Sequence, residues 1–362
     1  MGKRTPLYEK HLQLGGRIVD FAGWDLPVQY TSAIEEHMAV RTNAGLFDIS
    51  HMGEFSVKGK DSQQYLESLV PTSFSKLEDG KGMYSCLCNA NGGIIDDLFI
   101  FRITEDDFYL VVNAGTREKD FKWLKSRLEG DVVLEDLSDV TAKIDIQGPS
   151  SKAILQNVFS GVNLDKLERF HFTYSKFNGS RIMISNTGYT GEAGYELFIN
   201  PETAGALWDI LLEKGKPFNL IPCGLASRDS LRLEACYSLY GHELNENVNP
   251  VEAGLSWIVN SDKNYTASDI LRKAKAEGPG RRIVCLEIKE KGIPREGYRV
   301  MYEGADIGHV TSGGYSPVLK KGIAFALVKT GIVKTGSDVD IVIRDKNVGA
   351  SVVKRPFYSF NG

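Results

Sequence analysis

The chain has 362 residues, 42% of them hydrophobic and 25% charged, which is typical of a globular protein with two or three domains. Its longest apolar run, residues 323–328, is far shorter than the roughly 18 residues of a membrane-spanning helix. The N-terminus lacks the apolar core of a signal peptide, and five scattered cysteines, an odd number, suit reduced thiols. We therefore expect a cytoplasmic protein without a membrane segment.

The net charge of −4 is unevenly distributed. Residues 281–362 carry 14 Lys and Arg against 8 Asp and Glu, a local charge of +6, which leaves −10 for the rest of the chain. The basic side chains are dispersed rather than clustered with aromatic residues, which argues against a nucleic-acid partner. A basic C-terminal part could attract an acidic partner protein or an anionic ligand, and an ordinary solvated surface is the alternative.

Helix and strand signals alternate through the first 275 residues. Ser32 and Glu35 have the spacing of a capping box and predict a helix that ends at Gly45. Further helices are expected at residues 116–128, 149–158, 202–213 and 223–234, and strands at 54–57, 83–88, 98–103, 109–113, 142–146 and 181–185. This pattern predicts sheets with helices packed on them.

A domain boundary is expected at residues 275–280, where Gly278-Pro279-Gly280 follows a polar helix. Short strands separated by glycine-containing turns come next, at residues 283–288, 299–302, 308–311, 323–328 and 339–344. Such spacing is typical of a small β-barrel or sandwich. The predicted fold class is therefore α+β with an all-β C-terminal domain.

Two carboxylates, Asp96 and Asp97, follow the turn at Asn91-Gly92-Gly93 and begin an apolar strand. Because successive side chains of a strand point to opposite faces, one of the two must face inward. A carboxylate against an apolar surface has to be hydrogen-bonded or to have a shifted pKa. A carboxyl group with a shifted pKa can exchange protons near neutral pH. The alternative is that both aspartates merely complete the turn.

Residues 186–197 combine three glycines, two tyrosines and two glutamates just after a strand. Glycines let the backbone approach a flat ligand, tyrosines can stack on a heteroaromatic ring, and an ionised glutamate can accept parallel N–H bonds from its edge. The GxxGxxG spacing is not that of a dinucleotide fingerprint. A plain β-hairpin turn is the alternative.

Arg228 and Arg232 lie one turn apart on the helix expected at residues 223–234. They could bind a carboxylate or ring carbonyl of the same ligand, or form a structural ion-pair network. None of the six histidines has metal-ligand spacing. His51 is the one histidine considered as a functional candidate, and the alternative is that it only orients a turn. Cys86 and Cys88 share one strand face, either as packed or as redox-active thiols.

Taken in order, several short motifs resemble the T-protein family of the glycine cleavage system over essentially the whole chain. The matching segments are DFAGW at 20–24, FDISHMG at 47–53, GGIIDD at 92–97, GYTGE at 188–192, RDSLRLE at 228–234, TSG at 311–313 and KRPFY at 354–358. The resemblance implies a three-domain cloverleaf around a central folate-binding hole. Residues 1–52 and 140–275 would form the first domain, residues 53–139 an inserted α+β domain with the catalytic aspartate, and residues 276–362 the C-terminal β-barrel.

The family's reaction is an aminomethyl transfer from the lipoyl arm of the H-protein. The methylene goes to tetrahydrofolate, which becomes 5,10-methylenetetrahydrofolate, and ammonia leaves; neither a metal nor pyridoxal phosphate is implied. By resemblance, Asp97 is the catalytic carboxylate, Glu196 grips the pterin edge and Arg228 contacts folate. The remaining folate-binding positions implied by the family are Tyr84, Asn113, Tyr189, Tyr237 and Met52.

Three other interpretations are considered. The folate domain of sarcosine and dimethylglycine dehydrogenases follows a flavin-binding region, for which 362 residues leave no room. A folate-binding protein of iron–sulfur cluster assembly carries a Lys-Gly-Cys-Tyr-x-Gly-Gln-Glu stretch, which this sequence lacks. A folate-binding module without turnover is not excluded by the sequence.

Overall fold

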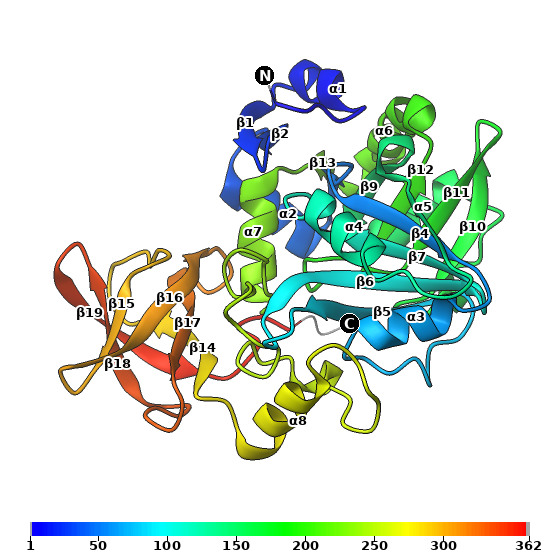
Figure 1. Ribbon diagram of the computed structural model, residues 1–362. Coiled ribbons are helices and arrows are strands. Elements are labelled where there is room, and N and C mark those ends of the chain that lie inside the picture. Colours follow the sequence, from blue (N-terminus) through cyan, green and yellow to red (C-terminus); the bar gives the residue numbers. More distant parts are fainter. Residues whose placement is uncertain (1, 360–362) are drawn as a thin grey trace.

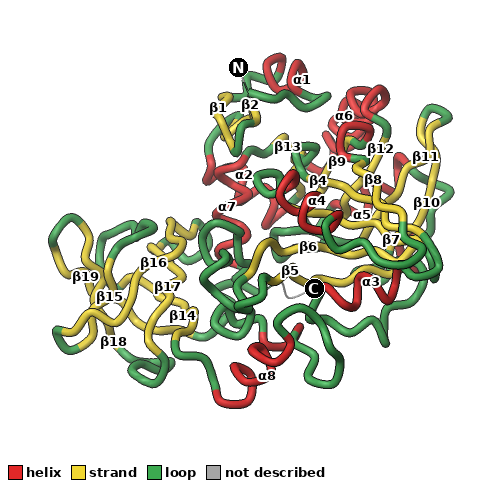
Figure 2. Tube along the Cα trace, in the orientation of Figure 1, coloured by secondary structure: helices red, strands yellow, loops and turns green. Residues whose placement is uncertain are grey.

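A computed structural model describes residues 2–359, which form three sheets and a closed barrel (Figure 1 and Figure 2). The chain begins with α1 (Tyr8–Gln13) and an antiparallel hairpin of β1 (Arg17–Phe21) and β2 (Trp24–Gln29). Helix α2 (Ala33–Thr42) starts as predicted, because the Ser32 side chain accepts a hydrogen bond from the Glu35 N–H. It ends earlier than Gly45, which lies in the following strand.

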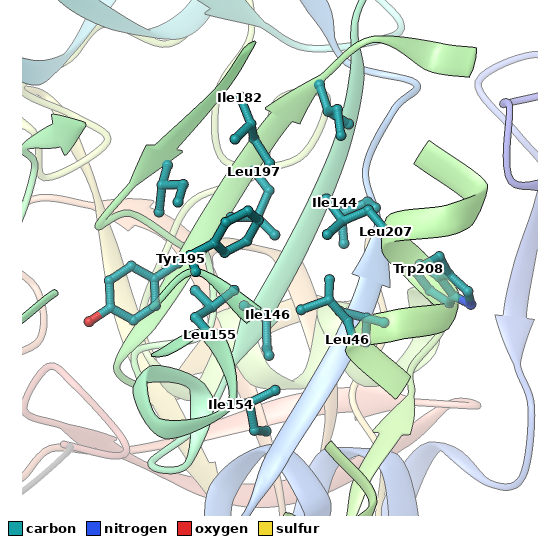
Figure 3. Packing of buried hydrophobic residues seen from close by; sticks show 14 of the residues in the cluster. Leu46, Ile144, Ile146, Ile154, Leu155, Ile182, Tyr195, Leu197, Leu207 and Trp208 are labelled. Atoms are coloured by element: carbon teal, nitrogen blue, oxygen red, sulfur yellow. The ribbon is translucent and has the colours of Figure 1, made fainter. Parts of the chain in front are cut away.

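A six-stranded sheet with the order β10-β11-β12-β9-β3-β13 forms the first layer. It is antiparallel except for the parallel pair β3 and β13. Its strands are β3 (Ala44–Asp48), β9 (Ala142–Gln147), β10 (Phe172–Phe177), β11 (Ser180–Ser185), β12 (Gly194–Ile199) and β13 (Leu220–Pro222). Helices α5 (Ser151–Val158) and α6 (Pro201–Gly215) cover its apolar face, where Figure 3 shows Ile144 beside Leu207.

The chain leaves this sheet after β3, builds a second sheet, and returns to the first with β9. The second sheet has the order β5-β6-β7-β4-β8. Its strands are β4 (Gly53–Lys58), β5 (Lys81–Cys88), β6 (Ile94–Thr104), β7 (Asp107–Val112) and β8 (Val133–Asp136). Helices α3 (Ser62–Leu69) and α4 (Arg117–Lys125) pack on one face of it through a separate core. This topology agrees with an inserted domain at residues 53–139. The domain bounds themselves stay a prediction.

The two sheets also pack against each other. Phe101 and Val111 of the second sheet share a buried cluster with Met183 and Phe198 of the first. The ring centroids of Phe101 and Phe198 are 5.8 Å apart at nearly a right angle, a favourable edge-to-face geometry. Apolar side chains therefore fill the layer between the sheets, and a polar group in that layer needs a partner or a ligand.

The C-terminal part is a closed six-stranded antiparallel barrel, which decides between the predicted barrel and sandwich. It follows α8 (Ser268–Glu277) and consists of β14 (Arg281–Ile288), β15 (Arg299–Tyr302), β16 (Ala305–Ser316), β17 (Lys321–Lys329), β18 (Asp338–Ile343) and β19 (Lys346–Val353). Alternate side chains of these strands fill its interior. In Figure 1, α7 (Leu225–Glu234) lies between the barrel and the two sheets. The fold class is α+β, as predicted.

Two predicted boundaries were wrong for local reasons. Gly45 does not end α2 but belongs to β3, where a Cβ atom would lie 2.5 Å from a Val40 methyl group and 2.6 Å from the Cys223 sulfur. The helix predicted to reach Leu128 ends at Lys125, because the N–H groups of Arg127 and Leu128 bond three rather than four residues back. Strand β12 was not predicted, although Tyr195, Leu197 and Ile199 alternate onto the core as a strand requires.

Candidate functional site

The polar site lies where the apolar layer between the two sheets ends. Asp97 shares a face of β6 with Phe99 and Phe101, which belong to the cluster between the sheets. On the first sheet, Glu196 shares a face of β12 with Phe198 of the same cluster. Strand periodicity thus carries both carboxylates onto the two facing surfaces. Each is only partly buried, as are the other six predicted site residues.

Asp97 is held by two neighbouring strands. The Tyr84 hydroxyl on β5 donates to Oδ2 of Asp97 at 2.9 Å, and Nδ2 of Asn113, just after β7, donates to Oδ1 at 2.7 Å. Burial and then the charge of Asp96 raise the pKa of Asp97 to about 7, against these two hydrogen bonds, which lower it. A carboxyl that titrates near neutral pH is suited to proton handling and to stabilising a cation.

Asp96 points to the opposite face of β6 and is fully buried. Its two oxygens accept the backbone N–H of Asn113 at 3.0 Å and the Asn113 amide at 2.9 Å. The interpretation that both aspartates only complete the turn is therefore wrong. The turn is closed by Asn89, whose side-chain oxygen accepts from the N–H groups of Asn91 and Gly93.

Glu196 sits in a network of polar side chains on the first sheet. Its Oε1 pairs with the Lys143 ammonium at 3.1 Å, and Thr187 donates a hydrogen bond to Oε2. Burial raises the pKa of Glu196, but Lys143 and Thr187 outweigh burial and leave that pKa below its ordinary value. Glu196 is thus an ionised acceptor at neutral pH, as binding of an N–H edge requires.

The two arginines of α7 have different surroundings. Arg228 pairs with Asp145 at 3.1 Å, and its guanidinium lies 4.9 Å from the ring centroid of Tyr189. Burial and the charge of Glu196 raise the pKa of Asp145 to about 7, against Arg228. Arg232 is 2% exposed and pairs with Glu243 at 3.0 Å. The structural ion-pair alternative therefore holds for Arg232, whereas Arg228 faces the site residues.

Tyr189 and Tyr237 stack on each other, with ring centroids 5.8 Å apart and planes at 27°. The Tyr189 hydroxyl donates to the Ser238 carbonyl, and Tyr237 accepts a hydrogen bond from Arg169 at 2.9 Å. Burial raises the pKa of Tyr189, while Arg228 lowers it and Asp97 raises it. Tyr189 therefore lies beside Arg228 and is exposed to the charge of Asp97.

Met52 packs against two clusters, one under α7 and the other between the sheets. It stands at the junction of the two layers. Its neighbour His51 is 3% exposed, and burial lowers the pKa of this imidazole to about 4, although Asp48 opposes the shift. Phe21 lies edge-on to the ring at 5.7 Å. His51 is thus a neutral, packed residue at physiological pH.

Sequence reasoning missed Lys143 and Asp145. Both lie on β9, where Ala142, Ile144 and Ile146 face the apolar core and the residues between them face the opposite side. The register places Asp145 directly opposite Glu196. The alternation of apolar and polar side chains over residues 142–147 could have identified this polar strand face.

The described residues include no cluster of His, Cys, Asp or Glu arranged to hold a metal ion. Their helices include none long and apolar enough to cross a membrane. All five cysteines are free, and the sulfurs of Cys86 and Cys88 are buried 3.6 Å apart.

Comparison with known proteins shows the family to which the chain belongs. Residues 7–263 match a family model described as the GCVT N-terminal domain, and residues 281–359 match the glycine cleavage T-protein C-terminal barrel domain. The chain belongs to the glycine cleavage T-protein family. It is 46% identical to an aminomethyltransferase of Geobacillus sp. (strain WCH70) over 99% of both chains, and 46% identical to that of Thermotoga maritima over 98% of both.

The structure of a T-protein family member supports the same assignment. The glycine cleavage system aminomethyltransferase T from Bartonella henselae superposes with a TM-score of 0.92 at 32% identity, covering 99% of this chain and 98% of that one. The T-protein-family chain described here is accordingly an enzyme, an aminomethyltransferase of the glycine cleavage system. Family membership favours transfer activity over the rival folate-binding interpretations.

Proposed function

We propose that this aminomethyltransferase takes its aminomethyl group from the lipoyl arm of an H-protein and gives the methylene to tetrahydrofolate. Two carbon–nitrogen bonds form to the folate nitrogens, while the bond to sulfur and the bond to the departing ammonia break. No net oxidation or reduction occurs. The chemistry needs neither a metal nor pyridoxal phosphate, because the carrier delivers the carbon already activated between sulfur and nitrogen. Family membership supports both substrates.

Asp97 is the proposed catalytic residue. As the carbon leaves sulfur, positive charge develops on the methylene and its nitrogen, and a fixed carboxylate at low solvent exposure stabilises such charge strongly. The same carboxylate can orient the attacking folate amine. The observation that carries this proposal is that Tyr84 and Asn113 hold Asp97 in place while the pKa of its carboxyl is raised to about 7.

The other predicted residues would bind the folate. Glu196, ionised by Lys143, would accept N–H bonds from the pterin edge, and Arg228 would donate to a ring oxygen or carboxylate. Tyr84, Tyr189 and Tyr237 would supply aromatic walls, Asn113 a donor, and Met52 an apolar surface at the entrance. Holding two substrates in one dry site can contribute several kcal/mol to the rate.

The wider assignments also remain proposals. A three-domain cloverleaf with a central folate-binding hole is supported by the inserted second sheet and the separate barrel. A cytoplasmic location is supported by five free thiols.

The test is a coupled assay with aminomethyl-loaded H-protein and tetrahydrofolate that follows ammonia and methylenetetrahydrofolate together. Asp97→Asn should lower kcat by a factor on the order of 100 or more, as does removal of other charge-stabilising groups, and should retain folate binding by calorimetry. Equal turnover by the variant, or ammonia release without methylenetetrahydrofolate, would contradict the proposal.

A further inference from the structure

A second buried aspartate stands behind the site. Asp120 lies on α4, which packs on the second sheet through Leu124 and Phe121. It is 0% exposed, and in the described part of the chain neither of its carboxyl oxygens has a hydrogen-bond donor of its own. A buried carboxylate without donors is costly by several kcal/mol. Asp120 therefore needs a neighbouring group that lowers the cost of burying its carboxyl.

That neighbour is Asp96, a second fully buried carboxyl, whose charge and side chain both raise the pKa of Asp120. Carboxylates only accept hydrogen bonds, so two carboxyl groups can bond only if one of them carries a proton. Both oxygens of Asp96 already accept N–H groups of Asn113, which favours its ionised form. The proton therefore belongs to Asp120, which donates to Asp96.

Asn113 links this pair to the site. Its side-chain amide bridges Oδ1 of Asp96 at 2.9 Å and Oδ1 of Asp97 at 2.7 Å. We propose that Asp120 is a positioning residue of the transfer reaction: its protonated carboxyl fixes Asp96, which fixes the Asn113 amide and so the orientation of Asp97. This inference rests on the proposed catalytic role of Asp97.

The charged groups around Asp96 and Asp120 determine the pH at which Asp120 loses its proton. Burial and the charge of Asp96 raise the pKa of Asp120 to about 10, and Thr116 and then Lys119 oppose the shift. The groups around the pair are Asp97 on β6, Lys119 on α4, Cys86 on β5 and Tyr240 after α7. Loss of the Asp120 proton would leave two carboxylates in contact, and the link to Asn113 would loosen.

Three variants test the proposal. Asp120→Ala should lower kcat on the order of 100-fold, since small misplacements of a catalytic group cost that much, with a smaller change in KM for tetrahydrofolate. Asp120→Asn keeps a neutral donor toward Asp96 and should restore most of kcat. Leu124→Ala on the same helix is the control, because it weakens the packing of α4 without touching the aspartates, and melting temperatures are measured for all three.

The pH profile separates positioning from simple structural support. The wild-type rate should fall as the pH rises through about 10, relative to Asp120→Asn, which has no proton to lose there. Equal rates for Asp120→Ala and wild type, or an alkaline limb unchanged in Asp120→Asn, would overturn the inference. If Asp120→Ala does not fold, the rate of Asp120→Asn and its pH profile still test the proposed positioning role. An inactive wild type in the coupled assay would instead reject the proposed function itself.

Discussion

Glu54 shows how a single residue can set the pH dependence of stability. It is fully buried on β4, and neither carboxyl oxygen has a hydrogen-bond partner among the described residues. Burial raises the pKa of Glu54 well above its ordinary value of 4.5, against Lys143 and Arg117. Above pH 4.5 the unfolded chain therefore loses this proton before the folded protein does.

The sign of the effect follows from proton linkage. Between the two pKa values the folded state binds more protons, so this residue lowers the unfolding free energy by about 1.4 kcal/mol for each unit of pH increase. Glu54→Gln removes the titration, and its stability relative to wild type should rise as the pH increases above 4.5. Urea unfolding at several pH values measures this, with exposed Glu118→Gln as control. A difference that does not vary with pH would show that Glu54 is ionised when folded.

At the scale of elements, a buried cation, Arg232, links α7 to the barrel. Arg232 pairs with Glu243 at 3.0 Å and donates to Ser312 of β16 at 2.9 Å. Removing one member of a buried pair leaves an uncompensated charge, so Arg232→Ala should reduce the unfolding free energy by about 3–5 kcal/mol. The matched control is Lys122→Ala, whose exposed pair with Glu118 contributes under about 1 kcal/mol. Similar losses in both variants, by urea unfolding, would contradict this role.

At the scale of the whole molecule, we propose that the basic C-terminal part helps to dock the H-protein, and the structure shows which of its arginines already have partners in the fold. Arg281 pairs with Glu252 at 2.9 Å, and Arg282 donates to the Val333 carbonyl, so reversing either charge would disturb the fold. The Arg295 side chain is exposed, and its only polar contact within residues 2–359 is with the Gly313 carbonyl at 3.5 Å. It is therefore the residue suited to a clean test.

Arg295→Glu should raise KM for the H-protein several-fold at low salt, because rim charges act mainly through the encounter rate, and should leave KM for tetrahydrofolate unchanged. The effect should shrink as added salt shortens the range of the field. Lys334→Glu, an exposed residue on another turn of the barrel, makes the same charge change. Equal effects of both variants would mean that overall charge acts, rather than a docking surface at Arg295.

Local patterns in the sequence determined much of the architecture. Alternating apolar residues between glycine turns predicted five of the six barrel strands, and Ser32 with Glu35 predicted the start of α2. These features depend on neighbours within a few residues, so the chain encodes them locally. The motif around Asp97 likewise marked the candidate catalytic strand through resemblance to a family.

Only the tertiary structure decided what each charged side chain contacts. Arg228 and Arg232 are equivalent by spacing, yet one meets Asp145 on β9 and the other meets Glu243 beside the barrel. Asp120 is 24 residues beyond Asp96 on another element, and nothing in the local pattern predicts that Asp96 raises the pKa of Asp120. Spacing fixes the face on which a side chain lies, but the packing of distant elements fixes its partner, and the partner determines its charge and role.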